Sequence, residues 1–281
     1  MFDFLAHEFM RNALIAGLLA SVVCGIVGTL VVVRRIVFIG GGISHASFGG
    51  VGLGYYLSFD PLLGALIFSL GSALGIGVLS KQAREREDTV IGMVWATGMA
   101  IGILLMGLTP GYAPDLMSYL LGSIIIVPTS DLWMILFLDL FILGTVVLLY
   151  KELLAISFDE EHAKISGLPV SLLYLLLLCM IALTVVVLIR VVGVILAIAL
   201  LTMPAAISGR FTTDLKTMMT LSVILSALFI VLGLWMSFEL PDLRPGATII
   251  IVSAVAYAVS IGIVRLNNRR RDRRPLGSAG E

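Results

Sequence analysis

The chain has 281 residues, of which 59% are hydrophobic and only 13% are charged, and its mean hydropathy is +1.11. Roughly a quarter of the residues in a soluble globular domain are charged, so this composition excludes such a domain and indicates a membrane protein. The formal net charge is zero, and the basic stretch from Arg265 to Arg274 directly follows an apolar run, so it is expected to be a membrane anchor and not a nucleic-acid site.

Apolar runs of about 20 residues follow one another along the chain, and this length crosses a hydrocarbon core as a helix. Helices are expected because backbone groups in lipid must be hydrogen-bonded within their own segment. The runs cover residues 12–33, 36–58, 61–80, 90–108, 131–150, 171–190, 193–209, 217–237 and 247–265. Residues 115–127 are apolar but too short to cross, which predicts a re-entrant or interfacial helix. Because 193–209 is short too, we predict an all-α polytopic protein with eight or nine transmembrane helices.

Lysine and arginine gather in alternate joints between the runs, and joints of this kind are typically cytoplasmic. With nine spans, this rule places the amino end outside and the carboxyl end in the cytoplasm. We expect a transmembrane domain over 1–266 and a basic, disordered cytoplasmic tail over 267–281, lying near anionic membrane lipid. The first run lacks the features of a cleaved signal peptide and is expected to remain in the mature protein.

The sequence contains no nucleotide-binding loop, no zinc-protease helix and no esterase motif. Cys24 and Cys179 both lie within apolar runs, where a thiol packs as a small hydrophobe. We therefore expect no catalytic residue, no permanently bound cofactor and no enzymatic activity in this chain.

Residues 40–54 read GGGISHASFGGVGLG and combine seven glycines with a single histidine. Gly41, His45, Gly49 and Gly52 recur at a spacing that lines one face of a helix, and small residues let helices approach closely in membranes. His45 is then expected on a glycine-lined interface or cavity wall. Two interpretations remain open, namely an imidazole that hydrogen-bonds to a neighbouring carbonyl and a metal ligand.

A metal site needs more ligands than one histidine. A second copy of the chain could supply another His45 across a two-fold axis, with Ser44 nearby. Asp139 lies about halfway along its apolar run, where an ionisable group is costly and is by default a functional candidate. The alternative for Asp139 is a buried, hydrogen-bonded carboxyl group.

The joint from Phe158 to Gly167 reads FDEEHAKISG and predicts a short amphipathic helix on the cytoplasmic face. Its acidic residues stand at the helix start, where negative charge is favourable to the helix dipole. These residues have two interpretations. They fit an ordinary capped helix in a loop, and they fit equally a site that contacts a partner. The candidate contact residues are Phe158, Asp159, Glu160, Glu161, His162, Ala163 and Gly167.

Five stretches occur in order: RRIVFIGGGISHASFGGVGLGYY, EDTVIGMVWATGMAIGILL, DLMSYLLGSI, ISFDEEHAKISGLPV and VVGVILAIALLTMPAA. Together they resemble the integral-membrane permease of the ABC-3 family of zinc, manganese and iron ABC importers, from about residue 12 to about residue 262. The resemblance implies a permease in the cytoplasmic (inner) membrane that works by alternating access. It implies a second permease copy, expected as a homodimer with a heterodimer left open, cytoplasmic ATPase subunits that bind ATP, and an extracytoplasmic metal-binding protein. It also implies that residues 158–167 form the coupling helix that contacts the ATPase; we call them the coupling segment.

The family's usual pattern has an aspartate four residues before the histidine, and here that position is Gly41. Loss of a hard oxygen ligand weakens the case for manganese and favours zinc, for which imidazole nitrogen is a good ligand. Zinc is therefore the expected cargo, with manganese or iron as alternatives, and Asp139 is a candidate for the missing carboxylate. A carrier driven by an ion gradient and a channel are the alternatives from other classes.

Overall fold

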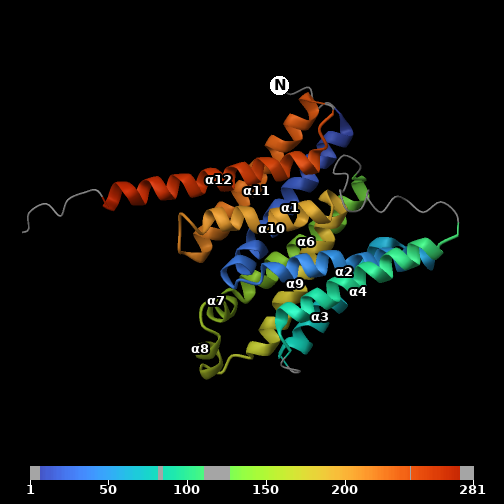
Figure 1. The fold of residues 1–281 in the computed structure, drawn as a ribbon, viewed down its shortest axis with the longest axis horizontal. Coiled ribbons are helices and arrows are strands. Elements are labelled where there is room, and N and C mark those ends of the chain that lie inside the picture. The colour runs from blue at the N-terminus through green and yellow to red at the C-terminus, as the bar shows by residue number, and fades with distance from the viewer. Residues whose placement is uncertain (1–6, 82–84, 111–126, 241, 273–281) are drawn as a thin grey trace, which may run out of the picture.

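The computed structural model describes residues 7–81, 85–110, 127–240 and 242–272, and within these ranges it contains α-helices and no strand (Figure 1). The all-α fold predicted from the apolar runs is thus confirmed. The helices are α1 (Glu8–Val33), α2 (Val37–Tyr56), α3 (Pro61–Lys81), α4 (Glu87–Leu108), α6 (Thr129–Leu148), α7 (Tyr150–Phe158), α8 (Glu160–Ile165), α9 (Val170–Val192), α10 (Val194–Ser208), α11 (Leu215–Glu239) and α12 (Pro245–Asp272).

Each of the nine apolar runs coincides with one helix, but not every helix is suited to cross a membrane alone. Seven helices of the described part are long and apolar enough, namely α1, α3, α4, α6, α9, α11 and α12. α10 has only 15 residues, and the apolar character of α2 is diluted by seven glycines. The predicted count of eight or nine spans is therefore not established. Apart from Val127, the predicted re-entrant segment 115–127 lies outside the described residues.

α12 continues as a helix to Asp272, past the boundary at 266 that the sequence suggested. Residues 267–272 are thus assigned to this helix, and the remainder of the tail, whose disorder stays a prediction, lies outside the described residues. The physical reason is that arginine is a good helix former, so a helix that begins in the apolar run can continue through the basic residues that follow it.

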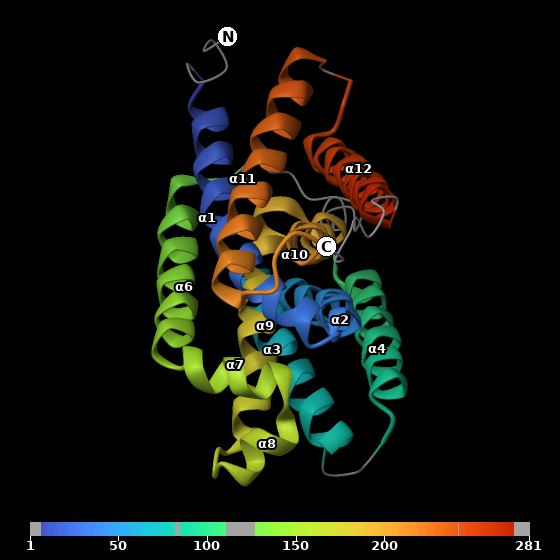
Figure 2. The same ribbon diagram turned by 90° about the vertical axis from the view of Figure 1, so that its left-hand side faces the viewer.

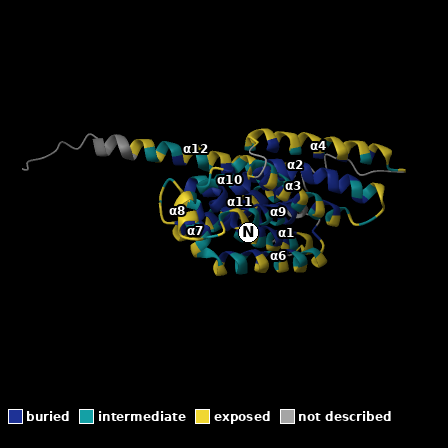
Figure 3. Ribbon diagram, turned by 90° about the horizontal axis from the view of Figure 1, so that it is seen from below, coloured by how far each residue is buried: buried dark blue, intermediate teal, exposed yellow. Residues whose placement is uncertain are grey.

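α1 and α9 form the centre of the molecule, and α4, α6 and α12 lie at its periphery. In the apolar stretches of α1 and α9, 67% and 72% of the residues are buried, against 22% in each of the three peripheral helices. Figure 3 shows this contrast as dark central helices and a largely exposed α4. The exposed side chains of the peripheral helices are mostly large and apolar, as expected for surfaces that face lipid or another subunit.

The path of the chain brings several helix ends together at one end of the molecule, which we call the α8 end. It holds the last residues of α1 and α3, the short helices α7 and α8, and the start of α9 (Figure 2). α9 and α10 are separated by Gly193, whose φ of 80° lies in the region that favours glycine. This break lets α10 leave the direction of α9 and pack on α1, α11 and α12.

Candidate functional site

α2 lies between α3 and α4, and its glycines are the reason that it can approach both helices closely. A Cβ atom on Gly50 would overlap the backbone carbonyl oxygen of Gly64 on α3. A Cβ atom on Gly52 would lie 2.6 Å from the carbonyl oxygen of Gly102 on α4. These distances leave no room for a side chain, so α2 is held by backbone-to-backbone packing of the kind that small residues permit in membranes.

The predicted glycine face is not uniform. Gly49 and Gly52 lie at close approach to α3 and α4, but a Cβ atom on Gly41 would meet only the Cδ1 atom of Ile198, at an ordinary 3.7 Å. The tightest contact belongs to Gly50, which the helical spacing did not single out. Spacing along one helix indicates which residues share a face, but it does not indicate where the partner helix comes nearest.

His45 is half-buried on α2 and stacks on Trp95 of α4, with 4.3 Å between the ring centroids and 8° between the ring planes. Its Nδ1 atom is buried and has no hydrogen-bond partner among the described residues. The indole Nε1 of Trp95 donates to the Sδ atom of Met99 at 3.2 Å and therefore does not donate a hydrogen bond to His45. A buried polar atom without a partner is costly, so this nitrogen is suited to a ligand that the chain itself does not supply.

Trp95 is a residue of this site that the sequence reasoning did not identify. It lies 50 residues from His45 in an apolar run whose other residues are typical of a membrane helix. Only the packing of α2 against α4 reveals that the indole covers one face of the imidazole.

Ser44 is fully buried, and its hydroxyl donates to the carbonyl oxygen of Gly40 at 2.7 Å, one helical turn back. Consecutive residues on a helix point about 100° apart, so Ser44 and His45 leave α2 in different directions. The hydroxyl proton of Ser44 is therefore engaged in a hydrogen bond within α2. The structure does not orient Ser44 and His45 toward a common ligand.

Asp139 is 5% exposed, and neither of its carboxylate oxygens has a hydrogen-bond partner among the described residues. It belongs to α6, which packs on α1 and α9, whereas α2 packs on α3, α4, α9 and α10. Figure 2 shows α6 and α4 on opposite sides of the molecule. Within one chain, the structure therefore does not bring Asp139 to His45. The described residues contain no group of three or more His, Cys, Asp or Glu that could hold a metal ion.

Replacing Asp139 by leucine should leave uptake within about twofold of the unmodified protein and should not lower its melting temperature. An apolar side chain of similar size removes a buried acid that has no partner, and such replacements are neutral or stabilising. Uptake by reconstituted vesicles and thermal unfolding in detergent would measure the two effects. A loss of uptake of about tenfold or more with an unchanged melting temperature would instead support a ligand role for Asp139.

The coupling segment folds as the end of α7, the short helix α8 and the turn that follows it. Asp159 caps α8, since its Oδ1 atom accepts a hydrogen bond from the backbone N–H of His162 at 2.9 Å. Gly167, with a φ of 82°, ends the turn. Phe158 and Ile165 are 63% and 84% exposed, so the segment presents large apolar side chains outward.

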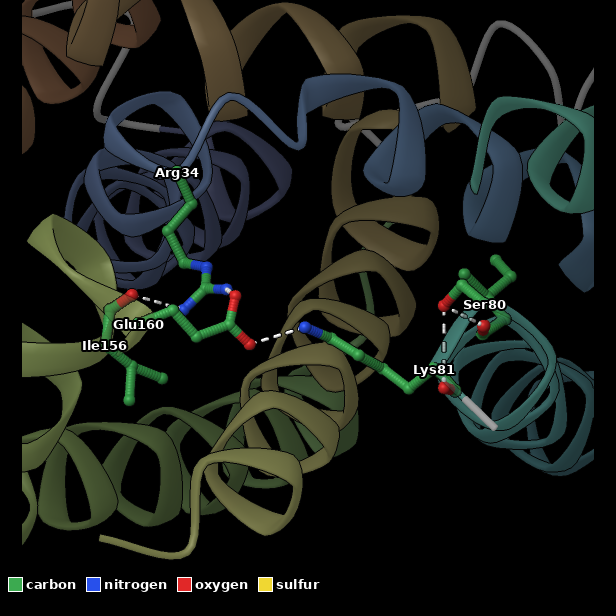
Figure 4. A network of polar contacts seen from close by, with 7 residues as sticks. Arg34, Ser80, Lys81, Ile156 and Glu160 are labelled. Atoms are coloured by element: carbon green, nitrogen blue, oxygen red, sulfur yellow. Dashed lines mark hydrogen bonds and ion pairs between the residues drawn. The ribbon is translucent and has the colours of Figure 1, made fainter. Parts of the chain in front are cut away.

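Of the other coupling residues, Ala163 is buried, and Glu161 and His162 are exposed. Glu160 differs from them, because its carboxylate lies between two cations from other helices (Figure 4). One is the guanidinium of Arg34, at 3.5 Å, and the other is the ammonium of Lys81. α8 is thereby tied to the ends of both α1 and α3.

Two further contacts complete this network. The Nη1 atom of Arg34 donates to the carbonyl oxygen of Ile156 at 2.6 Å, which holds α7 beside α1. Both cations also lie over the ring of Tyr174 on α9, at 5.3 Å for Arg34 and 4.9 Å for Lys81, within the range of cation–π attraction. From the sequence, Arg34 and Lys81 indicated only membrane orientation, because their partners are 126 and 79 residues away.

Comparison with known proteins gives a consistent result. Residues 6–263 match the model of the ABC 3 transport family. The chain is 49% identical over 265 residues to an uncharacterized membrane protein of Synechocystis sp., covering 94% of each chain. It is 31% identical over 256 residues to the manganese transport system membrane protein MntC of Halalkalibacterium halodurans, covering 91% of this chain and 87% of that protein.

A solved structure agrees with these sequence matches. PsaBC from Streptococcus pneumoniae, determined in complex with a Fab, contains a chain that superposes with a TM-score of 0.82 at 32% identity, covering 92% of this chain and 94% of that one. The resemblance seen in the sequence motifs is thus confirmed. The chain belongs to the ABC-3 transport family and is a multi-pass membrane subunit of a transporter, not an enzyme.

Proposed function

We propose that the chain is the permease subunit of an ATP-driven importer of a divalent transition metal ion. The observation that carries the proposal is His45, whose Nδ1 atom is buried without a partner in the described residues on a helix packed tightly by glycines. Neutral imidazole nitrogen is a good ligand for first-row divalent ions. The name of the Halalkalibacterium relative, a manganese transport system membrane protein, supports the same class of cargo.

The donors found in the described part of one chain are too few for a closed metal site. We therefore propose that two permease copies form a homodimer and that each contributes His45 to a shared path across the membrane. A site that binds weakly within each copy suits transport, because an ion that is moved must also leave. An extracytoplasmic metal-binding protein would deliver the ion to this path.

The coupling segment would connect this path to the ATPase subunit. We place the α8 end in the cytoplasm, together with the carboxyl end of the chain. Phe158 and Ile165, exposed and apolar, would pack against the ATPase. A movement of α8 would pass through Glu160 to α3, and from α3 to α2 through the Gly50–Gly64 contact. ATP binding by the partner would shift the two access states only to the extent that it binds one of them better.

Two metals fit the proposal on different grounds. Manganese appears in the name of the Halalkalibacterium relative, so it is the first cargo to test. The relatives give no specific support to zinc. The zinc expectation rests on Gly41 alone, which leaves His45 without a carboxylate one helical turn away.

Reconstituted vesicles that contain the permease and its ATPase, supplied with the metal-binding protein, test the function directly. We expect uptake of manganese or zinc that requires ATP, is inhibited by vanadate and survives ionophores that collapse proton and sodium gradients. A carrier driven by an ion gradient would show the opposite pattern. ATP-independent uptake would therefore contradict the proposal.

Replacing Glu160 by lysine should lower the metal transported per ATP hydrolysed by about tenfold. The change removes the carboxylate that pairs with both Arg34 and Lys81 and places a third positive charge beside them. Because the side chain of Arg34 is only 8% exposed, its charge would then be poorly compensated. The measurement is uptake and ATP hydrolysis in the same vesicles.

Glu85→Lys is the control, because Glu85 is an exposed acid shortly after the end of α3, lies outside the coupling segment and makes no ion pair within the described residues. It should change the ratio of transport to hydrolysis by less than about twofold. Glu160→Gln, which keeps the shape and removes the charge, should fall between the two. Equal effects at both positions would show that the network does not transmit the movement.

A further inference from the structure

A groove of ≈ 950 Å³ lies between α6 and α11 and reaches the first residues of α7. Figure 2 shows α6 on the opposite side of the molecule from α4. α6 and α11 both pack on α1, and Ile26 of α1 lines the groove between them. The walls are apolar, with Val147 on α6 and Val223 on α11 among the lining residues. Its volume lies within the range of sites that bind small organic molecules.

The polar groups of this groove lie at one end of it. Along α6 the apolar residues come first and Lys151 follows on α7, while along α11 Lys216 precedes the apolar residues. Both lysines therefore lie beyond the apolar walls, toward the α8 end. The ammonium of Lys216 is 5.1 Å from the ring centroid of Tyr150, which also lines the groove.

Neither lysine forms an ion pair in the part of the chain that the structure describes, although two acids are close. Glu152 lines the same groove. Asp214 caps α11, and its Oδ2 atom accepts hydrogen bonds from the backbone N–H of Thr217 at 2.8 Å and from its hydroxyl at 2.6 Å. These bonds, together with the nearby charge of Lys216, hold the pKa of Asp214 below its ordinary value. Since neither ammonium group is ion-paired within the described residues, both are available to an external anion.

We propose that this groove binds an anionic phospholipid, with an acyl chain between α6 and α11 and the headgroup phosphate between Lys151 and Lys216. The order of apolar walls and cationic rim matches the order of acyl chain and phosphate in a bilayer leaflet. Val147 and Ile224 are 67% and 57% exposed, which is unfavourable in water and favourable against an acyl chain. The bound lipid would connect α6 and α7 to α11, which do not pack extensively on one another.

Native mass spectrometry of the purified full chain in detergent tests the site with two lipids of identical acyl chains, dioleoyl phosphatidylglycerol and dioleoyl phosphatidylcholine. We expect about tenfold tighter binding of the first, since each lysine near a phosphate contributes favourably. The double variant Lys151→Gln/Lys216→Gln should bind the two lipids about equally. The double variant Arg35→Gln/Lys164→Gln removes two exposed cations from the same end but outside the groove, and it should keep the preference.

Two further measurements distinguish a lipid from a free phosphate and from a second protein chain as the occupant of the groove. Glycerol phosphate, which has the phosphate but no acyl chain, should not displace the lipid, and Val147→Trp should weaken lipid binding while both lysines remain. The proposal is overturned if the groove double variant keeps its preference, if the control double variant loses it, if glycerol phosphate competes equally, or if Val147→Trp changes the oligomeric state instead of lipid binding.

Discussion

Replacing Gly50 by leucine should reduce metal uptake to less than about a tenth of the unmodified level and should lower the melting temperature markedly. The new Cβ atom would overlap the backbone carbonyl oxygen of Gly64, and a backbone atom cannot turn aside as a side chain can. Overpacking costs about 1–3 kcal/mol where side chains can adjust, so we expect the upper end of this range or more. Thermal unfolding in detergent and uptake in vesicles are the measurements.

The chain offers two graded controls for this prediction. A Cβ atom on Gly71, which lies in α3 like Gly64, would meet nothing within 4 Å, so Gly71→Leu should keep both uptake and stability. Gly49→Leu should be intermediate, because the nearest atoms belong to the ring of Phe68, which can rotate, although the carbonyl oxygen of Gly98 is 3.0 Å away. If Gly50→Leu behaves like Gly71→Leu, the close packing of α2 on α3 is not required for transport.

The positions of the helices could be predicted from the sequence because the lipid environment imposes a length and a composition on each of them. The apolar run 61–80 corresponds to helix α3 (Pro61–Lys81), and the run 217–237 corresponds to helix α11 (Leu215–Glu239). What the apolar runs could not settle is whether a segment such as α2 crosses the membrane on its own. Its seven glycines reduce its hydropathy and at the same time create its packing against α3 and α4.

The candidate site could be predicted only in part, because its contacts join residues that are far apart in the sequence. The glycine-rich context of His45 was visible in the sequence, but the stacking on Trp95 was not. The acids at the start of the coupling segment were visible too, but the pairing of Glu160 with Arg34 depends on the packing of α7 and α8 beside α1. Such contacts are set by tertiary structure, and no local pattern encodes them.

Replacing His45 by alanine should lower uptake by about 100-fold, if the imidazole is a ligand in the path. Stability should change little, because Nδ1 has no partner to lose and only the stacking on Trp95, worth about 1 kcal/mol, disappears. Trp95→Phe is the control, since it keeps an aromatic ring beside the imidazole and should keep most of the uptake. A His45→Ala variant that transports normally would remove the main support for the proposed path.

The same site should also respond to an added carboxylate at position 41. Gly41→Asp places an acid one helical turn from His45, and the structure has room for its Cβ atom, which would meet only Ile198 at 3.7 Å. Carboxylate oxygen suits manganese better than imidazole does, so the ratio of manganese to zinc uptake should rise by about tenfold. Gly41→Asn has nearly the same shape without the charge and should leave the ratio unchanged. If the aspartate and asparagine variants give the same ratio, charge at this position does not select the ion, and the choice of metal must lie with other ligands, including those that a second copy of the chain contributes.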